Sequence, residues 1–326
     1  MKKKILVTGG AGYIGSHVLK ALEKEGFSPV VIDNLSSGHR EAVLWGRLVE
    51  GDLRDQKFLT AFFEAERPLA VLHFAAHIVV SESVVEPLKY YENNLSGTLN
   101  LLLCAQRFGV KAFVFSSSAA VYGAPEKIPI PEDHPVRPIN PYGASKAMVE
   151  QVLKDAFRAY GLPFVALRYF NAAGADPSGL IGEAHEPETH LIPLLLQTAL
   201  GQRPRFFLYG ADYPTPDGTC IRDFIHVEDL ATIHVLALKY LLDKGESLIL
   251  NCGYGHGYSV KEVLETAEKV VKRPIPYELK ERRPGDPPVL VADHKLLKET
   301  FSFHPAFDDL QAIIETAWRW EQNRRY

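Results

Sequence analysis

The chain has 326 residues, a formal net charge of −4 at pH 7 and 46% hydrophobic residues. This is the composition of an ordinary globular protein, long enough for one large domain or two moderate ones, and it argues against a disordered chain. Acidic residues outnumber basic ones, which argues against a nucleic-acid partner. No apolar run approaches the roughly 18 residues that a membrane helix requires, so we expect no membrane partner.

The N-terminus and the cysteines indicate the compartment. The apolar run at 5–7 is too short for a signal peptide. Cys104, Cys220 and Cys252 lie far apart and include no Cys-x-x-Cys pair. This pattern suits free thiols in a reducing compartment rather than disulfides or a zinc site, so we expect a cytoplasmic protein.

Short apolar runs alternate with longer helical patterns in the first half of the chain. We predict strands at 4–8, 29–33, 70–75, 111–116 and 164–169. We predict helices at 13–25, 56–66, 88–108 and 142–160. Nearly continuous apolar strands are typical of a sheet covered on both faces, and the alternation predicts an α/β fold with a doubly wound parallel sheet.

The second half of the chain is richer in loops. Gly, Pro and Asp punctuate residues 172–187 and 209–219, which predicts long connections there. Helices are expected at 191–200, 227–242, 260–271 and 307–322. Residues 247–251 are a candidate for a further strand of the main sheet.

A glycine-rich turn follows the first predicted strand. Gly10, Gly12 and Gly15 satisfy Gly-x-Gly-x-x-Gly, with Gly9 before them. Glycines alone also fit a simple turn, but here a strand precedes them and a helix follows, an arrangement that lets backbone amides approach a pyrophosphate. Asp33 ends the next strand, where a carboxylate can accept both hydroxyls of an adenosine ribose. The residues just after Asp33, Asn34 and Leu35, carry no positive charge, so NAD is favoured over NADP.

Tyr142 and Lys146 are the candidate proton-transfer pair. Pro141 suits a first helical turn, and in that helix the spacing of four places the phenol and the ammonium on one face. A nearby lysine together with a positive nicotinamide favours phenolate and lowers the tyrosine pKa. The spacing alone also fits a surface pair. Serines at 116–118 end an apolar strand at the edge where parallel sheets bind ligands, which favours the catalytic interpretation.

Together these residues resemble the extended short-chain dehydrogenase/reductase family and, within it, the UDP-glucose 4-epimerases. The resemblance runs from Ile5 to about Trp320. The segments that carry it are 12–17, 33–35, 116–123, 167–174, 218–227 and 282–286. It implies an NAD-dependent isomerase of galactose metabolism that interconverts UDP-glucose and UDP-galactose. C4 is oxidised to a 4-keto sugar, which rotates and is reduced again on its other face.

The resemblance also implies the site residues. Ser118, Tyr142 and Lys146 are the catalytic set, with Tyr142 as the base. The cofactor contacts are Gly9, Gly12, Tyr13, Ile14, Gly15, Asp33, Asn34, Asp52, Leu53, Phe74, Ala75, Ala76, Asn93, Ser118, Tyr142, Lys146 and Phe170. The substrate contacts are Ser118, Tyr142, Asn171, His190, Leu191, Phe207, Leu208, Tyr209, Arg222, Arg283, Asp286 and Leu290. Where many relatives have a lysine on the pyrophosphate, this chain has Ile78.

The larger organisation follows from the same resemblance. Residues 1–170 are expected to form an NAD-binding Rossmann-type domain, with a return of the chain around 221–252, and 171–326 mainly a UDP-sugar-binding domain. Apolar stripes in 88–108 and 148–160 suggest a homodimer. His185, Glu186 and His190 suggest metal ligands, but their loop lacks helical spacing and the reaction needs no metal, so none is expected.

Three alternatives stay open. Leu290 stands where relatives restricted to unacetylated hexoses have tyrosine, so a broader epimerase would also accept UDP-N-acetylglucosamine. A net dehydrogenase or reductase would share the catalytic set but release its cofactor, and an NAD-binding regulator would have no need of that set. Elimination of water is disfavoured, because Ala119 and Ala120 cannot transfer protons.

Overall fold

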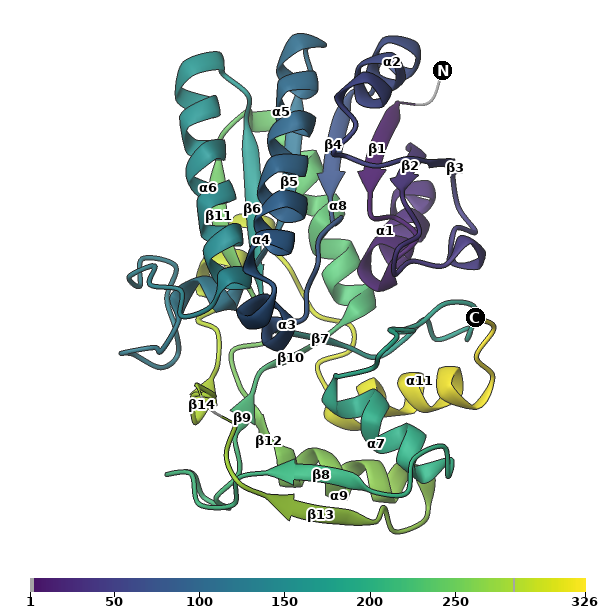
Figure 1. Cartoon of the computed structure of the whole chain (residues 1–326), viewed down its shortest axis with the longest axis vertical. Helices are drawn as coiled ribbons and strands as arrows, with labels where there is room; N and C mark the ends of the chain where they lie inside the picture. Colours follow the sequence, from purple (N-terminus) through teal and green to yellow (C-terminus); the bar gives the residue numbers. More distant parts are fainter. Residues whose placement is uncertain (1–2, 284) are drawn as a thin grey trace. The chain divides into compact units, whose positions relative to one another are not determined.

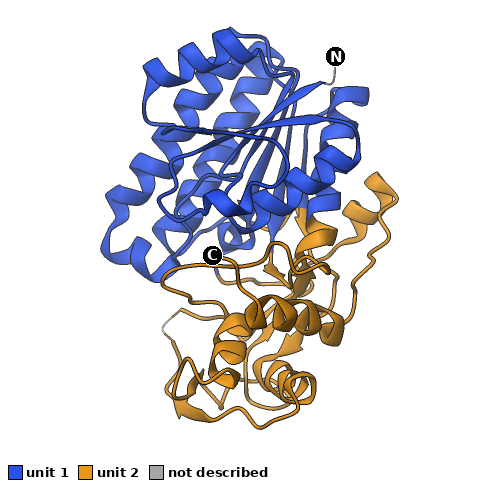
Figure 2. Ribbon diagram, turned by 90° about the vertical axis from the view of Figure 1, so that its right-hand side faces the viewer, with its two compact units in different colours: residues 1–123, 135–169, 231–250 blue, residues 124–134, 170–230, 251–326 orange. Residues whose placement is uncertain are grey.

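The chain folds into two compact units, coloured separately in Figure 2. Unit 1 comprises residues 1–123, 135–169 and 231–250, and unit 2 comprises 124–134, 170–230 and 251–326. The computed structural model describes residues 3–283 and 285–326. One division falls between Tyr169 and Phe170, next to the expected boundary at residue 170. The return to unit 1 starts at residue 231 rather than 221, and the excursion at 124–134 has no counterpart in the sequence analysis.

A seven-stranded sheet forms the centre of unit 1 (Figure 1). Its spatial order is β11 (Leu248–Cys252), β6 (Phe164–Tyr169), β5 (Ala112–Ser118), β4 (Ala70–His73), β1 (Lys4–Thr8), β2 (Ser28–Asp33) and β3 (Arg47–Glu50). The pairings from β6 to β3 are all parallel. The Rossmann-type α/β class is therefore confirmed, and β11 is the further strand expected at 247–251. The strand order reverses between β1 and β4, and ligands of such sheets bind outside the carboxyl ends at this point.

Helices cover both faces of this sheet, as the continuous apolar strands predict. The longer helices are α1 (Tyr13–Lys24), α2 (Gln56–Glu66), α5 (Gly97–Arg107), α6 (Pro141–Tyr160) and α8 (Val227–Lys244). The connections also contain the short helical segments η1 (Arg40–Ala42), α3 (Val80–Val85), α4 (Pro87–Tyr90) and η3 (Ala119–Tyr122). Alternate strand residues such as Leu6, Val71 and Phe113 pack with apolar residues of α2, α5 and α6 in one core. Their neighbours Ile5 and Val7 are equally buried and point to the opposite face, because strand side chains alternate.

The helix predicted at 88–108 is interrupted. Between α4 and α5 the backbone forms a π-helical turn, η2 (Tyr91–Ser96), a feature frequent at functional sites. Asn94 on this turn accepts a hydrogen bond from the His77 amide at 2.8 Å and donates to the His77 carbonyl at 3.0 Å. The wide turn thus lets one buried amide side chain hold the segment after β4, a contact that hydrophobic periodicity does not reveal.

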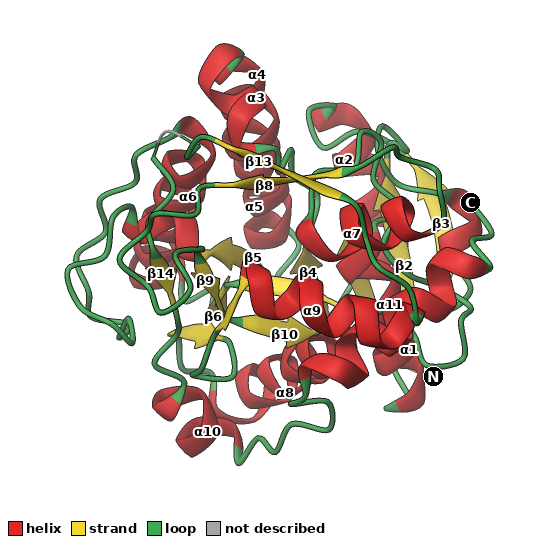
Figure 3. Ribbon diagram, turned by 90° about the horizontal axis from the view of Figure 1, so that it is seen from below, coloured by secondary structure: helices red, strands yellow, loops and turns green. Residues whose placement is uncertain are grey.

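Unit 2 combines short strands with three packed helices (Figure 3). Its elements are β7 (Asn171–Ala173), α7 (Leu191–Ala199), β8 (Phe206–Tyr209), β9 (Ile221–Arg222), β10 (Phe224–His226), β12 (Tyr258–Ser259), α9 (Val260–Val271), β13 (Tyr277–Lys280), β14 (Val289–Leu290), α10 (Lys295–Phe301) and α11 (Leu310–Gln322). Strand β7 pairs with β10, β8 pairs with β13, and β9 lies between β12 and β14. Helices α7, α9 and α11 pack against one another. None of the described helices is both long and apolar enough to cross a membrane.

Candidate active site

The glycine turn between β1 and α1 has two kinds of glycine. Gly9 has a φ of +72°, and a Cβ there would lie 2.5 Å from the Ala75 nitrogen. A Cβ at Gly15 would lie 2.2 Å from the Gly9 oxygen. At Gly12 the φ is −85°, and a Cβ would meet only the Gly9 oxygen, at 3.4 Å. Packing of the chain explains Gly9 and Gly15. At Gly12 a Cβ would make a single contact, so packing alone does not require a glycine at this position at the N-terminus of α1.

Asp33 lies at the end of β2, beside this turn. Its carboxylate accepts hydrogen bonds from the Ala11 amide at 3.0 Å and the Leu35 amide at 2.9 Å. Burial raises the pKa of Asp33, and these two hydrogen bonds oppose the rise. Each carboxylate oxygen can accept more than one hydrogen bond, so the fixed carboxylate suits the two hydroxyls of a ribose.

The other predicted cofactor residues of unit 1 follow the strands next to β1. Asn34 donates to the Asp52 carboxylate at 3.0 Å. Arg54 binds the same carboxylate at 2.8 Å and lowers the pKa of Asp52. Leu53 belongs to the apolar core. The remaining three, Phe74, Ala75 and Ala76, come directly after β4 at the reversal of strand order, and Asn93 lies on the π-helical turn.

The predicted catalytic side chains meet in unit 1. Ser118 ends β5, and Tyr142 and Lys146 lie one turn apart near the start of α6, which Asn140 caps by accepting from the Gly143 amide. The Ser118 hydroxyl lies close enough to the Tyr142 hydroxyl to act on its pKa. Lys146 Nζ donates to the Ser116 carbonyl at 2.7 Å and lies 5.9 Å from the centre of the Tyr142 ring. The structure therefore brings together a hydroxyl donor, a phenol and an amine.

The electrostatics of this set differ from the sequence-based expectation. Burial raises the pKa of Tyr142, although the hydrogen bond with Ser118 opposes the rise. Burial lowers the pKa of Lys146 to about 7. In the chain alone the pKa of Tyr142 is therefore raised and not lowered. The lowering of this pKa that the sequence predicts would have to come from the positive charge of the nicotinamide.

A buried network that the sequence analysis missed supports the catalytic helix. Glu150, one turn after Lys146, forms a bidentate ion pair with Arg168 of β6 at 2.9 and 2.6 Å. Glu150 also accepts from the Ser117 hydroxyl at 2.6 Å, and Arg168 donates to the Tyr122 hydroxyl at 2.8 Å. The network joins α6 to β5, β6 and η3. An arginine within an apolar strand was the available signal, because charged side chains are rarely buried without a partner.

Three of the predicted substrate contacts, Phe207, Leu208 and Tyr209, lie on strand β8 of unit 2. Alternation along the strand buries Leu208 with Phe206, whereas Phe207 is 41% exposed. The Arg283 guanidinium lies 4.1 Å from the centre of the Tyr209 ring. Phe207 and Tyr209 thus offer aromatic side chains to a ligand, and Leu208 could contribute only through its backbone.

A second group of predicted substrate residues surrounds β9. Arg222 lies in register with Leu290 of β14 and is 3.8 Å from the Asp286 carboxylate. Its neighbour Asp223, also missed, accepts from the amides of Tyr254, Gly255 and Ala292 at 2.8, 3.0 and 3.1 Å. This buried carboxylate fixes the backbone on which Arg222 stands.

Asn171, Phe170 and their neighbours form a third part of unit 2. Asn171 begins β7 and lies in register with Phe224 of β10. Its amide donates to the Asp223 carbonyl at 3.0 Å, and the Phe170 amide donates to the Cys252 carbonyl at 3.2 Å. The backbone of both residues is therefore held by neighbouring strands.

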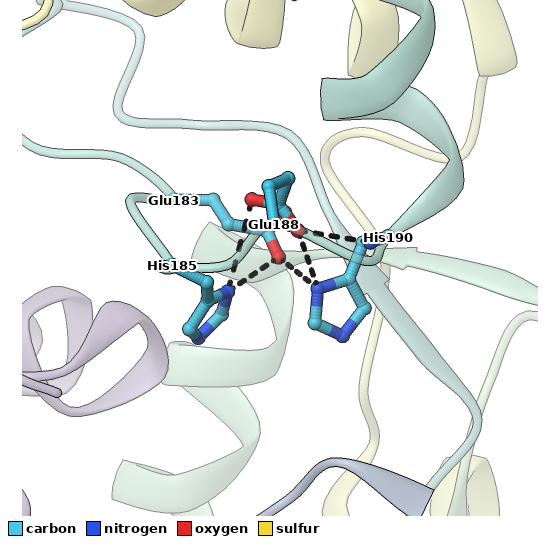
Figure 4. Close-up of side chains that lie close together, drawn as sticks. All are labelled: Glu183, His185, Glu188 and His190. Atoms are coloured by element: carbon cyan, nitrogen blue, oxygen red, sulfur yellow. Dashed lines mark hydrogen bonds and ion pairs between the residues drawn. The ribbon is translucent and has the colours of Figure 1, made fainter. Parts of the chain in front are cut away.

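His190 and Leu191 lie at the start of α7. His190 precedes the first helical residue, Leu191, and its Nδ1 lies 2.7 Å from Glu183 Oε1 and 3.0 Å from Glu188 Oε1 (Figure 4). Burial acts to lower the pKa of His190, but the two carboxylates raise it well above its usual value. Burial acts to raise the pKa of Glu183, but His190 and His185 hold it at about 2.

The chain is similar to known proteins over nearly its whole length. UDP-glucose 4-epimerase of Rhizobium meliloti is 53% identical over 98% of this chain and 97% of its own length, and that of Azospirillum brasilense is 54% identical over 98% and 92%. The solved structure of UDP-glucose 4-epimerase from Brucella ovis with NAD has a TM-score of 0.95 at 50% identity, covering 97% of each chain. The UDP-Glc/GlcNAc 4-epimerase of Campylobacter jejuni has a TM-score of 0.86 at 45% identity, covering 98% of this chain and 99% of its own. The family model described as the NAD dependent epimerase/dehydratase family matches residues 5–253, and the chain belongs to this family.

Proposed function

We propose that the protein interconverts UDP-glucose and UDP-galactose by reversible oxidation at C4 of the hexose. The observation that carries the proposal is the catalytic set itself, in which Ser118 lies beside the Tyr142 hydroxyl and Lys146 lies on the same helix face. Ala119 and Ala120 follow Ser118 and offer no acid or base for elimination. The solved relatives with NAD and with UDP-sugars support the same substrate class.

Unit 1 is the proposed NAD-binding unit. Gly12 and the amides of Tyr13 and Ile14 at the start of α1 would receive the pyrophosphate, and Asp33 would accept the ribose hydroxyls. These residues are sufficient to receive NAD, although Ile78 stands where many relatives have a lysine that contacts the pyrophosphate. When bound, NAD supplies the chemistry that removes a hydride from C4 and returns it to the opposite face.

Side chains of unit 1 remove the proton of the sugar 4-hydroxyl and return it. Tyr142 Oη takes this proton, and the Ser118 hydroxyl holds the reacting oxygen by a hydrogen bond. Lys146 is fixed by the Ser116 carbonyl and places a positive charge near the phenolate when it is protonated. On the return step Tyr142 gives the proton back, so no net proton is consumed.

Unit 2 is the proposed UDP-binding unit. Arg222 and Arg283 can pair with diphosphate oxygens, and Phe207 and Tyr209 can contact the uracil. Asp286, 3.8 Å from Arg222, can accept from a ribose hydroxyl. Binding energy placed on the nucleotide leaves the hexose free to present either face, which an epimerase requires.

The test uses protein purified without added cofactor. Incubation with UDP-galactose should yield UDP-glucose, and Tyr142→Phe should reduce the rate by about 10²–10⁴-fold. Release of NADH in proportion to the substrate consumed would instead support a net dehydrogenase. Retained NAD without any turnover would support a binding protein and contradict the proposal.

We also propose tolerance of N-acetylated hexoses. Leu290 is aligned with Arg222 and carries no phenol, and one similar solved structure is a UDP-Glc/GlcNAc 4-epimerase. Leu290→Tyr should lower turnover of UDP-N-acetylglucosamine while sparing UDP-glucose. Undetectable turnover of the acetylated substrate by the unaltered enzyme would exclude this extension.

A homodimer through the apolar face of α3–α5 is proposed as the assembly. Val84, Val85, Leu88 and Leu103 are 61%, 73%, 78% and 61% exposed there. A second copy would cover this face, since clustered exposed apolar side chains mark interaction sites. Light scattering should give twice the chain mass, and Leu88→Glu combined with Leu103→Glu should give the monomer. The three buried free cysteines support a reducing, cytoplasmic location.

A further inference from the structure

Four side chains of one loop converge in unit 2 (Figure 4). Glu183, His185, Glu188 and His190 each direct one potential ligand atom to the same place, and these atoms lie within 4.8 Å of one another. His190 Nδ1 is 2.7 Å from Glu183 Oε1, and His185 Nδ1 is 3.0 Å from the same oxygen. The spacing of these residues in the sequence follows no helix or strand, so the convergence is a property of the folded loop.

The loop that carries them is held by the surrounding structure. Buried Trp320 on α11 donates from Nε1 to the Glu183 carbonyl at 2.8 Å. A Cβ at Gly182 would lie 2.4 Å from the same indole ring, so the backbone is tightly packed there. Glu188 Oε1 accepts from the amides of Thr189 and His190 at 2.7 and 2.9 Å. The backbone and one carboxylate of the cluster are therefore positioned before any ligand arrives.

One atom of the cluster lacks a partner. Glu188 is 7% exposed, and its Oε2 is buried without a hydrogen bond from any described residue. The atom lies 3.9 Å from His185 Nδ1, which is too long for a hydrogen bond. Leaving a buried carboxylate oxygen unpaired is costly, and the ion pairs between the histidines and the other oxygens do not explain it.

We propose that Glu183, His185, Glu188 and His190 bind one divalent transition-metal ion, with Zn²⁺ as the best match. Imidazole nitrogens and carboxylate oxygens are both zinc ligands, and the two of each kind here supply the four ligands of a tetrahedral site. Bonds of about 2.0–2.1 Å in a tetrahedron require ligand atoms about 3.3–3.4 Å apart. Glu183 Oε1 lies 3.0 Å from His185 Nδ1 and 2.7 Å from His190 Nδ1, and Glu188 Oε2 lies 3.9 Å from His185 Nδ1, so shifts of well under 1 Å would reach that spacing. The imidazoles disfavour Mg²⁺ and Ca²⁺, which prefer oxygen ligands.

The ion would act as a clamp on the start of α7. His190 directly precedes Leu191, the first residue of that helix, and the other three ligands lie in the preceding loop. The ion is a positioning element and takes no part in the proton or hydride transfer. Because His190 is also a predicted substrate contact, the inference is tested by metal binding and stability rather than by turnover.

The test uses full-length untagged protein, stripped with a chelator that is then removed. Calorimetric titration should show that one Zn²⁺ binds per chain. The protein should retain this ion during dialysis, as metal analysis would show. Zn²⁺ should raise the melting temperature, and Co²⁺ should give the visible bands of a tetrahedral site. His185→Ala and Glu188→Gln should each weaken Zn²⁺ binding by at least about 10–100-fold, the loss seen when only an outer partner is removed.

The controls separate this site from ordinary histidine chemistry. Glu188→Gln keeps an oxygen for the Thr189 amide, so it should fold and lose only the metal. His256→Ala removes a histidine of an exposed pair with Asp308, 2.7 Å apart in the same unit, and should bind Zn²⁺ as the unaltered protein does. The proposal is wrong if the unaltered chain binds no zinc, if both ligand variants bind it equally well, or if Mg²⁺ binds as tightly. Epimerase assays of the stripped protein report on the proposed function separately.

Discussion

Replacing Gly12 with alanine should separate cofactor binding from folding. Its backbone angles, φ −85° and ψ 177°, are open to alanine, and the new Cβ would meet only the Gly9 oxygen at 3.4 Å. Gly15→Ala is the matched control three residues away in the same motif. There the Cβ would lie 2.2 Å from the Gly9 oxygen and 2.8 Å from the Gly10 Cα, and neither backbone atom can move cheaply.

The expected changes in stability follow from these contacts. Alanine at position 12 reduces the freedom of the unfolded chain, which stabilises by about 0.4–1 kcal/mol. It is a poorer N-cap than glycine, which offsets that gain, so the free energy of unfolding should change by less than about 1 kcal/mol. Forcing a methyl group into the packed backbone at position 15 should cost about 1–3 kcal/mol or more.

Gly12→Ala should reduce the affinity for NAD although it changes the stability little. The methyl group at position 12 would occupy the space proposed for the pyrophosphate, so the affinity for NAD should fall at least about tenfold, or about 1.4 kcal/mol. Urea denaturation followed by circular dichroism measures the stability, and titration of cofactor-free protein with NAD measures the affinity. If Gly12→Ala bound NAD normally, or lost as much stability as Gly15→Ala, the assignment of Gly12 to the cofactor would be wrong.

Further predictions concern the catalytic helix. Glu150→Ala removes the carboxylate partner of buried Arg168 and should cost about 3–5 kcal/mol in urea denaturation, whereas Glu150→Leu with Arg168→Met should cost much less; equal losses would show that the ion pair is not the cause. Because the pKa of Lys146 falls from 10.5 to about 7 on folding, the unfolded chain binds more protons between these two values, so the free energy of unfolding should rise as the pH is raised from about 7 to 10.5 and should show no effect of this group below about 7. Lys146→Met should flatten the pH dependence of the urea midpoint, and an unchanged slope would contradict the burial argument. NAD should lower the pKa of Tyr142, seen in the absorbance difference between the unaltered protein and Tyr142→Phe; a pKa unmoved by NAD would remove the nicotinamide from the explanation.

Much of unit 1 could be predicted because its signals are local. The runs at 4–8 and 164–169 match β1 and β6 residue for residue, since a strand buried on both faces must be continuously apolar. The helix at 56–66 is equally accurate, and Asp55 caps it by accepting from the Lys57 and Phe58 amides. The helix at 88–108 was wrong in detail, because its π-helical turn is maintained by Asn94 against the backbone of His77, 17 residues away.

Some residues of the candidate site could likewise be predicted from local sequence, and others depend on tertiary packing. Gly12, Tyr142 and Lys146 could be chosen from motif spacing, because a turn or one helix face brings such residues together by itself. The pairing of Glu150 with Arg168 depends on how α6 lies against β6, and no short-range pattern encodes it.

The local sequence thus determined the strands, most helices and the short motifs, since their geometry is set by neighbours within a few residues. Only the tertiary structure decided how Glu183, His185, Glu188 and His190 come together, because Trp320, 137 residues from Glu183, holds their loop. The tertiary structure also decided the pKa shifts of Tyr142 and Lys146, because these shifts arise from burial of the two side chains away from water.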